Sequence, residues 1–247
     1  METFDLIVLS GLSLLVAGTI KGLAGLGLPT ASAGIMTLFI APRTAIAIIV
    51  IPMLFANAWQ CWRAGGIASA ISGYTPFALA LAVLLFITVN ATASAPDRLI
   101  FAVLGLSILS FCIVNLLVTI PRLPDRLDRP AQILAGCVAG VLGGLSGVWA
   151  APMVFYLTAR QVEKDEFIRA TGLFMFIGTV PLILGYIQQG FLTPDLALIG
   201  TLMIGPAILG FSLGERLRRG MSSERFRVVF LWIFMLLGLN LLRRGIF

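Results

Sequence analysis

Two glycine-rich stretches interrupt long apolar runs and free backbone groups that could bind a small ligand. Residues 16–29 read VAGTIKGLAGLGLP, and residues 138–152 read VAGVLGGLSGVWAAP. Glycine and proline break helices, which releases N–H and C=O groups. In a membrane, such irregular backbone occurs only where protein or a water-filled cavity surrounds it. Interrupted segments at matching positions of two halves therefore predict a binding site near mid-membrane.

The two stretches are copies of one motif, and we expect its backbone to contact the ligand. The alternative is close helix packing, because small residues four apart let two helices approach. Packing alone explains neither the prolines nor the duplication. The first copy contributes Gly22, Gly25, Gly27 and Pro29 to the predicted site, and the second contributes Gly144, Gly147 and Pro152.

Two basic residues could provide charge for an anion. Lys21 lies inside the first stretch, where a charge is costly unless it faces a cavity. Its long side chain could instead reach the membrane surface from a fully spanning helix. Arg169 follows the second stretch. Its guanidinium suits a tetrahedral or pyramidal oxyanion, but it could also anchor the helix at the interface and pair with Asp165.

Neutral polar side chains accompany these cations in the segments that follow each stretch. Asn57 and Gln60 are spaced to share one helix face, and Thr179 is the repeat equivalent of Asn57. Such groups either line a path or bond neighbouring helices, and the repeat favours the path. Trp149, within the second stretch, is expected to form a wall or a gate of the cavity.

The sequence lacks the residues that most other membrane chemistries need. It has no histidine, and its three cysteines show neither metal-ligand nor disulfide spacing. Motifs of serine hydrolases and zinc peptidases are absent. Carboxylates, which cation transporters use, are nearly absent from the apolar segments. We therefore expect no enzyme, no metal and no cofactor. A small anion is the expected substrate, because cations, helix N-termini and neutral donors bind anions.

The duplicated motif resembles that of the TauE/SafE family of sulfite and organosulfur-anion exporters. In that family a GxxGxxG-like turn followed by proline opens each half of a small membrane protein. The second copy, GGLSGVWAAPMVFYL followed by EFIRAT, is the closer match. The first copy departs by carrying Lys21 where the second has Gly143, and Leu28 before Pro29. The resemblance covers nearly the whole chain. It implies export of a small sulfur anion, such as sulfite or a short organosulfonate, across the bacterial plasma (inner) membrane.

The composition indicates an all-α polytopic membrane protein. Hydrophobic residues make up 59% of the chain and charged residues 11%, against about 25% charged in soluble domains. The N-terminus METFDLIVLS lacks the basic residues of a signal peptide, so we expect it to begin the first span. The net charge of +6 lies mainly in loops, where it directs topology and does not indicate a nucleic-acid partner.

Ten apolar segments divide the chain into two similar halves. Two of them are too short to cross a bilayer, and each directly follows a glycine-rich stretch. Each half therefore consists of a Gly/Pro-broken helical hairpin and three transmembrane helices. The halves are residues 1–120 and 131–247, joined by a linker at 121–130. The segments are residues 4–23, 29–41, 44–62, 74–94, 98–120, 131–149, 152–159, 166–189, 194–213 and 226–242.

The distribution of basic residues predicts that both termini lie outside. The linker and the loop 214–225 carry the densest positive charge, and short basic loops stay in the cytoplasm. The first half then enters from outside and the second from the cytoplasm, which makes the halves inverted repeats. Arg243 and Arg244 fit this topology least well, because it places them outside.

Together these features predict a transporter that works by alternating access. The anion would lie between the two hairpins while one half rocks against the other. A transporter of another small anion, such as a short carboxylate, fits the same residues. A membrane-embedded enzyme or a scaffold subunit fits them less well, because catalytic residues are missing and a scaffold has no need of duplicated hairpins. The expected partners are the small anion and the lipid bilayer, and the sequence specifies no oligomeric state.

Overall fold

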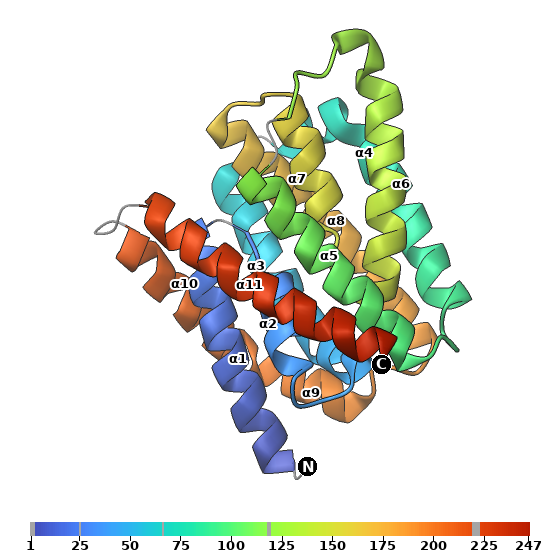
Figure 1. The fold of residues 1–247 in the computed structure, drawn as a ribbon, viewed down its shortest axis with the longest axis vertical. Coiled ribbons are helices and arrows are strands. Elements are labelled where there is room, and N and C mark those ends of the chain that lie inside the picture. Colours follow the sequence, from blue (N-terminus) through green and yellow to red (C-terminus); the bar gives the residue numbers. More distant parts are fainter. Residues whose placement is uncertain (1–2, 25, 66, 118–119, 219–222) are drawn as a thin grey trace.

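A computed structural model describes residues 3–24, 26–65, 67–117, 120–218 and 223–247. Within these residues the secondary structure is entirely helical, as the sequence predicts (Figure 1). The cause is physical, because a helix bonds its own backbone polar groups where lipid offers no partner. The elements are α1 (Thr3–Ala24), α2 (Leu28–Met36), α3 (Pro42–Ala64), α4 (Ile67–Ala91), α5 (Asp97–Leu117), the 3₁₀ turn η1 (Asp125–Leu127), α6 (Asp128–Ser146), α7 (Ala150–Ala159), α8 (Lys164–Gln188), α9 (Pro194–Leu202), α10 (Ile204–Arg218) and α11 (Ser223–Ile246).

Six stretches of the described residues are long and apolar enough to cross a membrane. They are α1, α3, most of α4, α5, α8, and α9 together with α10. The helices α6 and α11 are also long, with 19 and 24 residues. The chain is therefore an integral membrane protein. The segment predicted at 194–213 is divided in the structure, because α9 ends at Leu202 and α10 begins at Ile204.

Each glycine-rich stretch joins a long helix to a short one, and two hairpins result. The first consists of α1 and α2, and the second of α6 and α7. The short helices have 9 and 10 residues. At 1.5 Å per residue they measure about 15 Å, roughly half of the bilayer core. Proline lies in the first turn of both, where its missing N–H removes no helical hydrogen bond.

Glycines bring the long helices together in pairs. The helix α1 lies along α10, and α6 lies along α4 (Figure 1). A methyl group at Gly18 would overlap the carbonyl oxygen of Ala207 on α10. One at Gly140 would lie 2.9 Å from the carbonyl oxygen of Leu81 on α4. The helix pairs α5–α11, α4–α8 and α3–α8 also pack closely. The N-terminus and the linker lie at opposite ends of the molecule (Figure 1).

Candidate functional site

The first glycine-rich turn leaves the N-terminus of α2 open inside the protein. Gly27 precedes the helix with a φ of 99°, a left-handed conformation that glycine adopts without steric cost. No side chain caps α2, and Leu28, Pro29 and Thr30 in its first turn are buried. The unbonded N–H groups and the positive end of the helix dipole favour an anion at this position. Gly25, also predicted for the site, lies outside the described residues.

The second turn leaves the N-terminus of α7 open in a similar way. Gly147 ends α6 with a φ of 69°, and its N–H donates to the carbonyl oxygen of Gly143 at 2.8 Å. Trp149 precedes α7, and no side chain caps this helix. Pro152 lies half-buried in its first turn. Both short helices thus begin uncapped, among largely buried residues.

Lys21 ends inside the protein and not at its surface. Only 3% of the residue is exposed, and its Nζ donates to Oδ1 of Asn57 on α3 at 2.6 Å. The described part of the chain brings no carboxylate into an ion pair with it. A buried ammonium without a counter-ion is unfavourable, so an anion that reaches Lys21 gains a strong partner. In this conformation the side chain of Lys21 does not extend to the membrane surface, which was the alternative.

Three predicted site residues and one neighbour each have a buried donor without a hydrogen-bond partner in the described structure. The donors are Nδ2 of Asn57, Nε1 of Trp149 and Nε of Arg169, and Thr30 on α2 adds a hydroxyl. The ion pair between Arg169 and Asp165 that their spacing allows is not formed among the described residues. An unsatisfied buried donor costs about 1–3 kcal/mol, so each of these atoms is a position that a ligand could stabilise.

Trp149 is fully buried between two helices. Its ring fills the space that glycine leaves at Gly143 on α6 and Gly178 on α8, since a methyl group at either would lie within 3.0 Å of the indole. This position makes Trp149 a wall between the second hairpin and α8. Whether it also moves as a gate stays a prediction.

Gln60 and Thr179 already use their donors within the protein. The Nε2 of Gln60 donates to the carbonyl oxygen of Ile168 on α8 at 3.0 Å. The hydroxyl of Thr179 donates to the carbonyl oxygen of Met175, one turn earlier in the same helix, at 2.6 Å. Asn57 and Gln60 therefore face different helices, α1 and α8, although their spacing suggests a common face. Gln60 joins helices in this structure, and a role in binding stays a prediction for both.

Gly22 and Gly144 lie at helix contacts. A methyl group at Gly22 would overlap the carbonyl oxygen of Phe211 on α10. One at Gly144 would lie 2.8 Å from the carbonyl oxygen of Leu85 and 2.6 Å from Thr88 on α4. Both glycines therefore allow close packing, which was the alternative to ligand contact.

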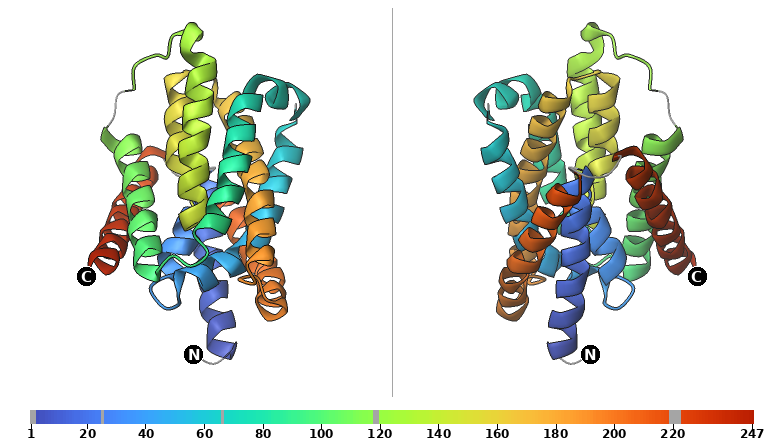
Figure 2. Two further views of the ribbon diagram at one scale, coloured as in Figure 1. Left: turned by 90° about the vertical axis from the view of Figure 1, so that its right-hand side faces the viewer. Right: turned by 90° about the vertical axis from the view of Figure 1, so that its left-hand side faces the viewer.

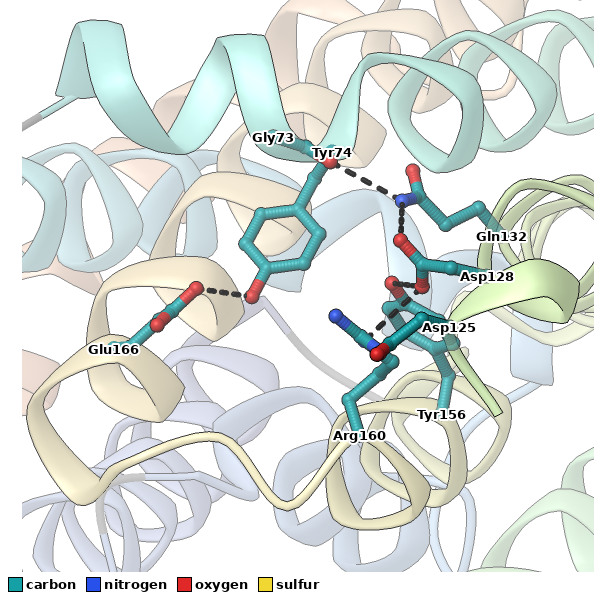
Figure 3. A network of polar contacts seen from close by, with 8 residues as sticks. All are labelled: Gly73, Tyr74, Asp125, Asp128, Gln132, Tyr156, Arg160 and Glu166. Atoms are coloured by element: carbon teal, nitrogen blue, oxygen red, sulfur yellow. Dashed lines mark hydrogen bonds and ion pairs between the residues drawn. The ribbon is translucent and has the colours of Figure 1, made fainter. Parts of the chain in front are cut away.

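A polar network at the linker end was not predicted from the sequence (Figure 3). Asp128 accepts from the hydroxyl of Tyr156 at 2.8 Å, from Nε2 of Gln132 at 3.1 Å, and pairs with Arg160 at 3.1 Å. Gln132 also donates to the carbonyl oxygen of Gly73 at 3.1 Å.

This network fixes a kink in α4. Tyr74 has non-helical angles, φ −124° and ψ 18°, two residues before Pro76, and its hydroxyl donates to Glu166 on α8. A proline inside an apolar run was the one sequence signal for this kink. Outside the spans, the Arg160 guanidinium lowers the pKa of the Asp125 carboxyl through a 2.8 Å contact.

The described residues include no group of three His, Cys, Asp or Glu side chains that could hold a metal ion.

The chain matches the protein-family model described as sulfite exporter TauE/SafE over residues 10–241. Comparisons with curated proteins and with solved structures gave no match. The matched region contains both hairpins, the kinked helix α4 and the linker.

Proposed function

The chain belongs to the sulfite exporter TauE/SafE family of membrane transporters, and we propose that it exports sulfite or a short organosulfonate bound at Lys21. The observation that carries this proposal is the buried Nζ of Lys21, which has a neutral partner at 2.6 Å and no carboxylate in an ion pair. A site of this kind binds an anion and repels a cation. The family match supports a sulfur-containing anion in particular.

In the proposed site the ligand receives full positive charges from Lys21 and Arg169 and several neutral donors. Lys21 supplies one of these charges, and Nδ2 of Asn57 is free to donate to an oxyanion oxygen. The uncapped N-termini of α2 and α7 add backbone N–H groups and the positive ends of their dipoles. Further donors without a partner in the described structure would complete the anion's hydrogen bonds, and they are Nε of Arg169, Nε1 of Trp149 and the hydroxyl of Thr30.

The packing supports two equivalent, interleaved halves. The first helix of each half lies along a helix late in the other half, as α1 does with α10 and α6 with α4. At the end of α2, the carbonyl oxygen of Thr37 accepts a hydrogen bond from the guanidinium of Arg244. At the end of α7, the carbonyl oxygen of Ala159 accepts a hydrogen bond from the N–H of Leu123. These correspondences support two structurally related halves, and their inverted arrangement with both termini outside is part of the proposal.

The same packing refines the proposed alternating access. Glycine contacts bind α1 to α10 and α6 to α4 too closely for these helices to slide past one another. The units that rock are therefore the two hairpins, each with its partner helix from the opposite half. The anion lies between the hairpins and becomes accessible from one side at a time.

Binding measurements on the purified protein test the proposal. Sulfite, sulfoacetate, taurine and acetate are titrated into wild-type protein and into Lys21→Gln, which keeps most of the side-chain volume. We expect sulfite or sulfoacetate to bind most tightly. Lys21→Gln should weaken that binding by about 1.5–3 kcal/mol, the scale of a hydrogen bond to a charged group, or roughly ten- to a hundredfold.

The control variant is Arg98→Gln, which removes an exposed charge at the start of α5. It should bind as the wild type does. If the wild type prefers acetate, the substrate is a carboxylate and not a sulfur anion. If Lys21→Gln and the wild type bind the anion with equal affinity, Lys21 does not belong to the binding site.

A further inference from the structure

A pocket between α5, α6 and α7 is lined by neither Lys21 nor Asn57, and Pro152 is the one predicted site residue, among those that the structure describes, that contributes to its lining. Its volume is about 370 Å³, which lies within the range of ligand pockets. Val114 of α5, Leu134 and Val138 of α6, and Phe155 of α7 are among the residues that line it. Its lining is almost wholly apolar. Water would find few hydrogen-bond partners there, so the pocket suits hydrocarbon.

The pocket opens toward the face of the molecule that lipid covers. Its lining residues Leu134 and Phe155 are 67% and 46% exposed, and large exposed apolar side chains on a membrane protein are expected to face lipid. Residues 120–127 arch between α5 and α6 at the linker end (Figure 2, left). Leu123 in this arch also lines the pocket, and its N–H donates to the carbonyl oxygen of Ala159 at 2.8 Å. The linker thus forms a roof over a pocket that is open at the side.

The roof carries an excess of positive charge, because the four arginines Arg122, Arg126, Arg129 and Arg160 outnumber the two aspartates Asp125 and Asp128. Arg122, Arg126 and Arg129 are exposed and form no ion pair within the described part of the chain. The neighbouring carboxylates Asp125 and Asp128 are already paired with Arg160, at 2.8 and 3.1 Å. The three arginines therefore remain available to an external anion. Basic clusters at the ends of membrane helices attract anionic lipid headgroups.

We propose that the pocket binds one acyl chain of an anionic phospholipid whose headgroup phosphate contacts Arg122, Arg126 and Arg129. Apolar volume, lateral opening and adjacent positive charge together match an amphipathic lipid of negative charge. The acyl chain lies against Ala151 and Pro152, in the first turn of α7. The lipid consequently supports the short helix from the side opposite the protein core. This site depends on the membrane location of the chain and not on the identity of the transported anion.

The acyl part of the proposal is tested by filling the pocket. Ala135 lines it, and Ala135→Trp places an indole in the space of the acyl chain. The matched control is Leu209→Trp, on the exposed face of α10. Full-length proteins are purified with native lipid, and bound phosphatidylglycerol is counted by native mass spectrometry. We expect at least a tenfold loss of bound lipid in Ala135→Trp and none in the control. Equal retention in both variants overturns the proposal.

The headgroup part is tested by neutralising the roof. In Arg122→Gln, Arg126→Gln and Arg129→Gln, singly and combined, phosphatidylglycerol affinity should fall about fivefold for each arginine removed. Arg98→Gln, at the other end of the molecule, is the control and should keep wild-type affinity. Phosphatidylcholine should bind all variants equally weakly. Equal binding of the two lipids by the wild type overturns the headgroup assignment.

A measurement on the wild type covers the case in which Ala135→Trp does not fold. Phosphatidylglycerol with a diazirine in its acyl chain is photolysed in vesicles that contain the protein. Adducts should concentrate on Leu134, Val138 and Phe155, relative to the same experiment with a phosphatidylcholine analogue. A second copy of the chain could cover this face instead of lipid. In that case a cysteine at Leu134 would cross-link two copies and the adducts would be absent, which refutes the lipid.

Discussion

At the scale of single residues, the molecule buries the cation of Lys21 beside a neutral amide and not beside a carboxylate. The Nζ of Lys21 meets only the amide oxygen of Asn57 among its described polar contacts. An amide orients the ammonium without cancelling its charge, so the charge stays available to a ligand. A carboxylate at the same place would form a stable internal pair and close the site.

Asn57→Asp tests this distinction. The new carboxylate would lie about as close to Nζ as the amide oxygen does now, at 2.6 Å. We expect the variant to fold at least as well as the wild type and to lose roughly ten- to a hundredfold in sulfite affinity. Calorimetric titration measures the affinity, and thermal unfolding in detergent measures the stability. Asn115→Asp is the control, since Asn115 donates only within its own helix. Wild-type affinity in Asn57→Asp would falsify the role of Lys21.

The positive φ of Gly147 gives a second test at this scale. Gly147 and Gly190 have nearly equal φ values, 69° and 70°. A methyl group at Gly147 would lie 3.1 Å from Ile46, whereas one at Gly190 would meet nothing within 4 Å. Gly190→Ala should therefore cost about 1–2 kcal/mol from the left-handed conformation alone. Gly147→Ala should cost more, because Cγ1 and Cγ2 of Ile46 would both lie 3.1 Å from the added methyl group. Equal unfolding temperatures for the two single variants would contradict this account.

The sequence predicted the two helix breaks well because glycine and proline act through local geometry. It left two alternatives for Lys21, since burial of a long side chain depends on helices far away in the chain. It placed Asn57 and Gln60 on one face, which their spacing supports. The structure directs one to α1 and the other to α8, because two different helices pack on either side of α3. The hydrogen-bond partners of Asn57 and Gln60 depend on tertiary packing, and the spacing of residues along one helix gives no information about that packing.

At the scale of elements, glycines decide which helices form rigid pairs. On α10, a methyl group at Gly210 would overlap the carbonyl oxygen of Leu15, whereas one at Gly205 would lie in open space. Both residues are helical, and a helix prefers alanine to glycine. Gly205 lies in the first turn of α10, where this preference is weaker, and of the two glycines only Gly210 packs against the backbone of α1.

Gly210→Ala and Gly205→Ala form a matched pair for this idea. Gly205→Ala should stabilise the protein by at most about 1 kcal/mol, the full difference in helix propensity in a helix interior. Gly210→Ala should destabilise it by several kcal/mol, because backbone cannot move aside as a flexible side chain can. Thermal unfolding in detergent measures both changes. A mild effect at Gly210 would mean that α1 and α10 separate easily and that the proposed rocking units are wrong.

Sequence patterns were less informative about the connections between elements. The short helices α2 and α7 were predicted within a few residues, because each follows a glycine-rich turn. The division of 194–213 into α9 and α10 was not predicted, although Gly205 and Pro206 follow Met203 and a glycine–proline pair is a signal for a break in a helix. The network around Asp128 joins α4, α6, α7 and α8. It was not found because its members are spread over the chain without a repeating pattern.

At the scale of the whole molecule, charge and shape agree on an orientation. The linker with its arginines lies at one end, and α9 with the N-terminus lies toward the other (Figure 1). Basic loops stay on the cytoplasmic side, so the linker should be inside. Single cysteines at Pro124 and at Asp195, in a background without the native cysteines, report this. An impermeant thiol reagent added to cells should label Asp195→Cys and spare Pro124→Cys. The reverse labelling pattern would invert the topology.

In the proposed site, the burial of Lys21 also makes the binding of the anion sensitive to the membrane voltage. An anion that reaches this lysine from either side crosses part of the voltage across the membrane. The full voltage is worth about 2.3 kcal/mol per elementary charge for each 100 mV. Because the first hairpin holds its cation inside the protein, the arrival of the anion is itself a movement of charge through the field. Binding alone should therefore appear as a transient current, before any anion has been released on the other side.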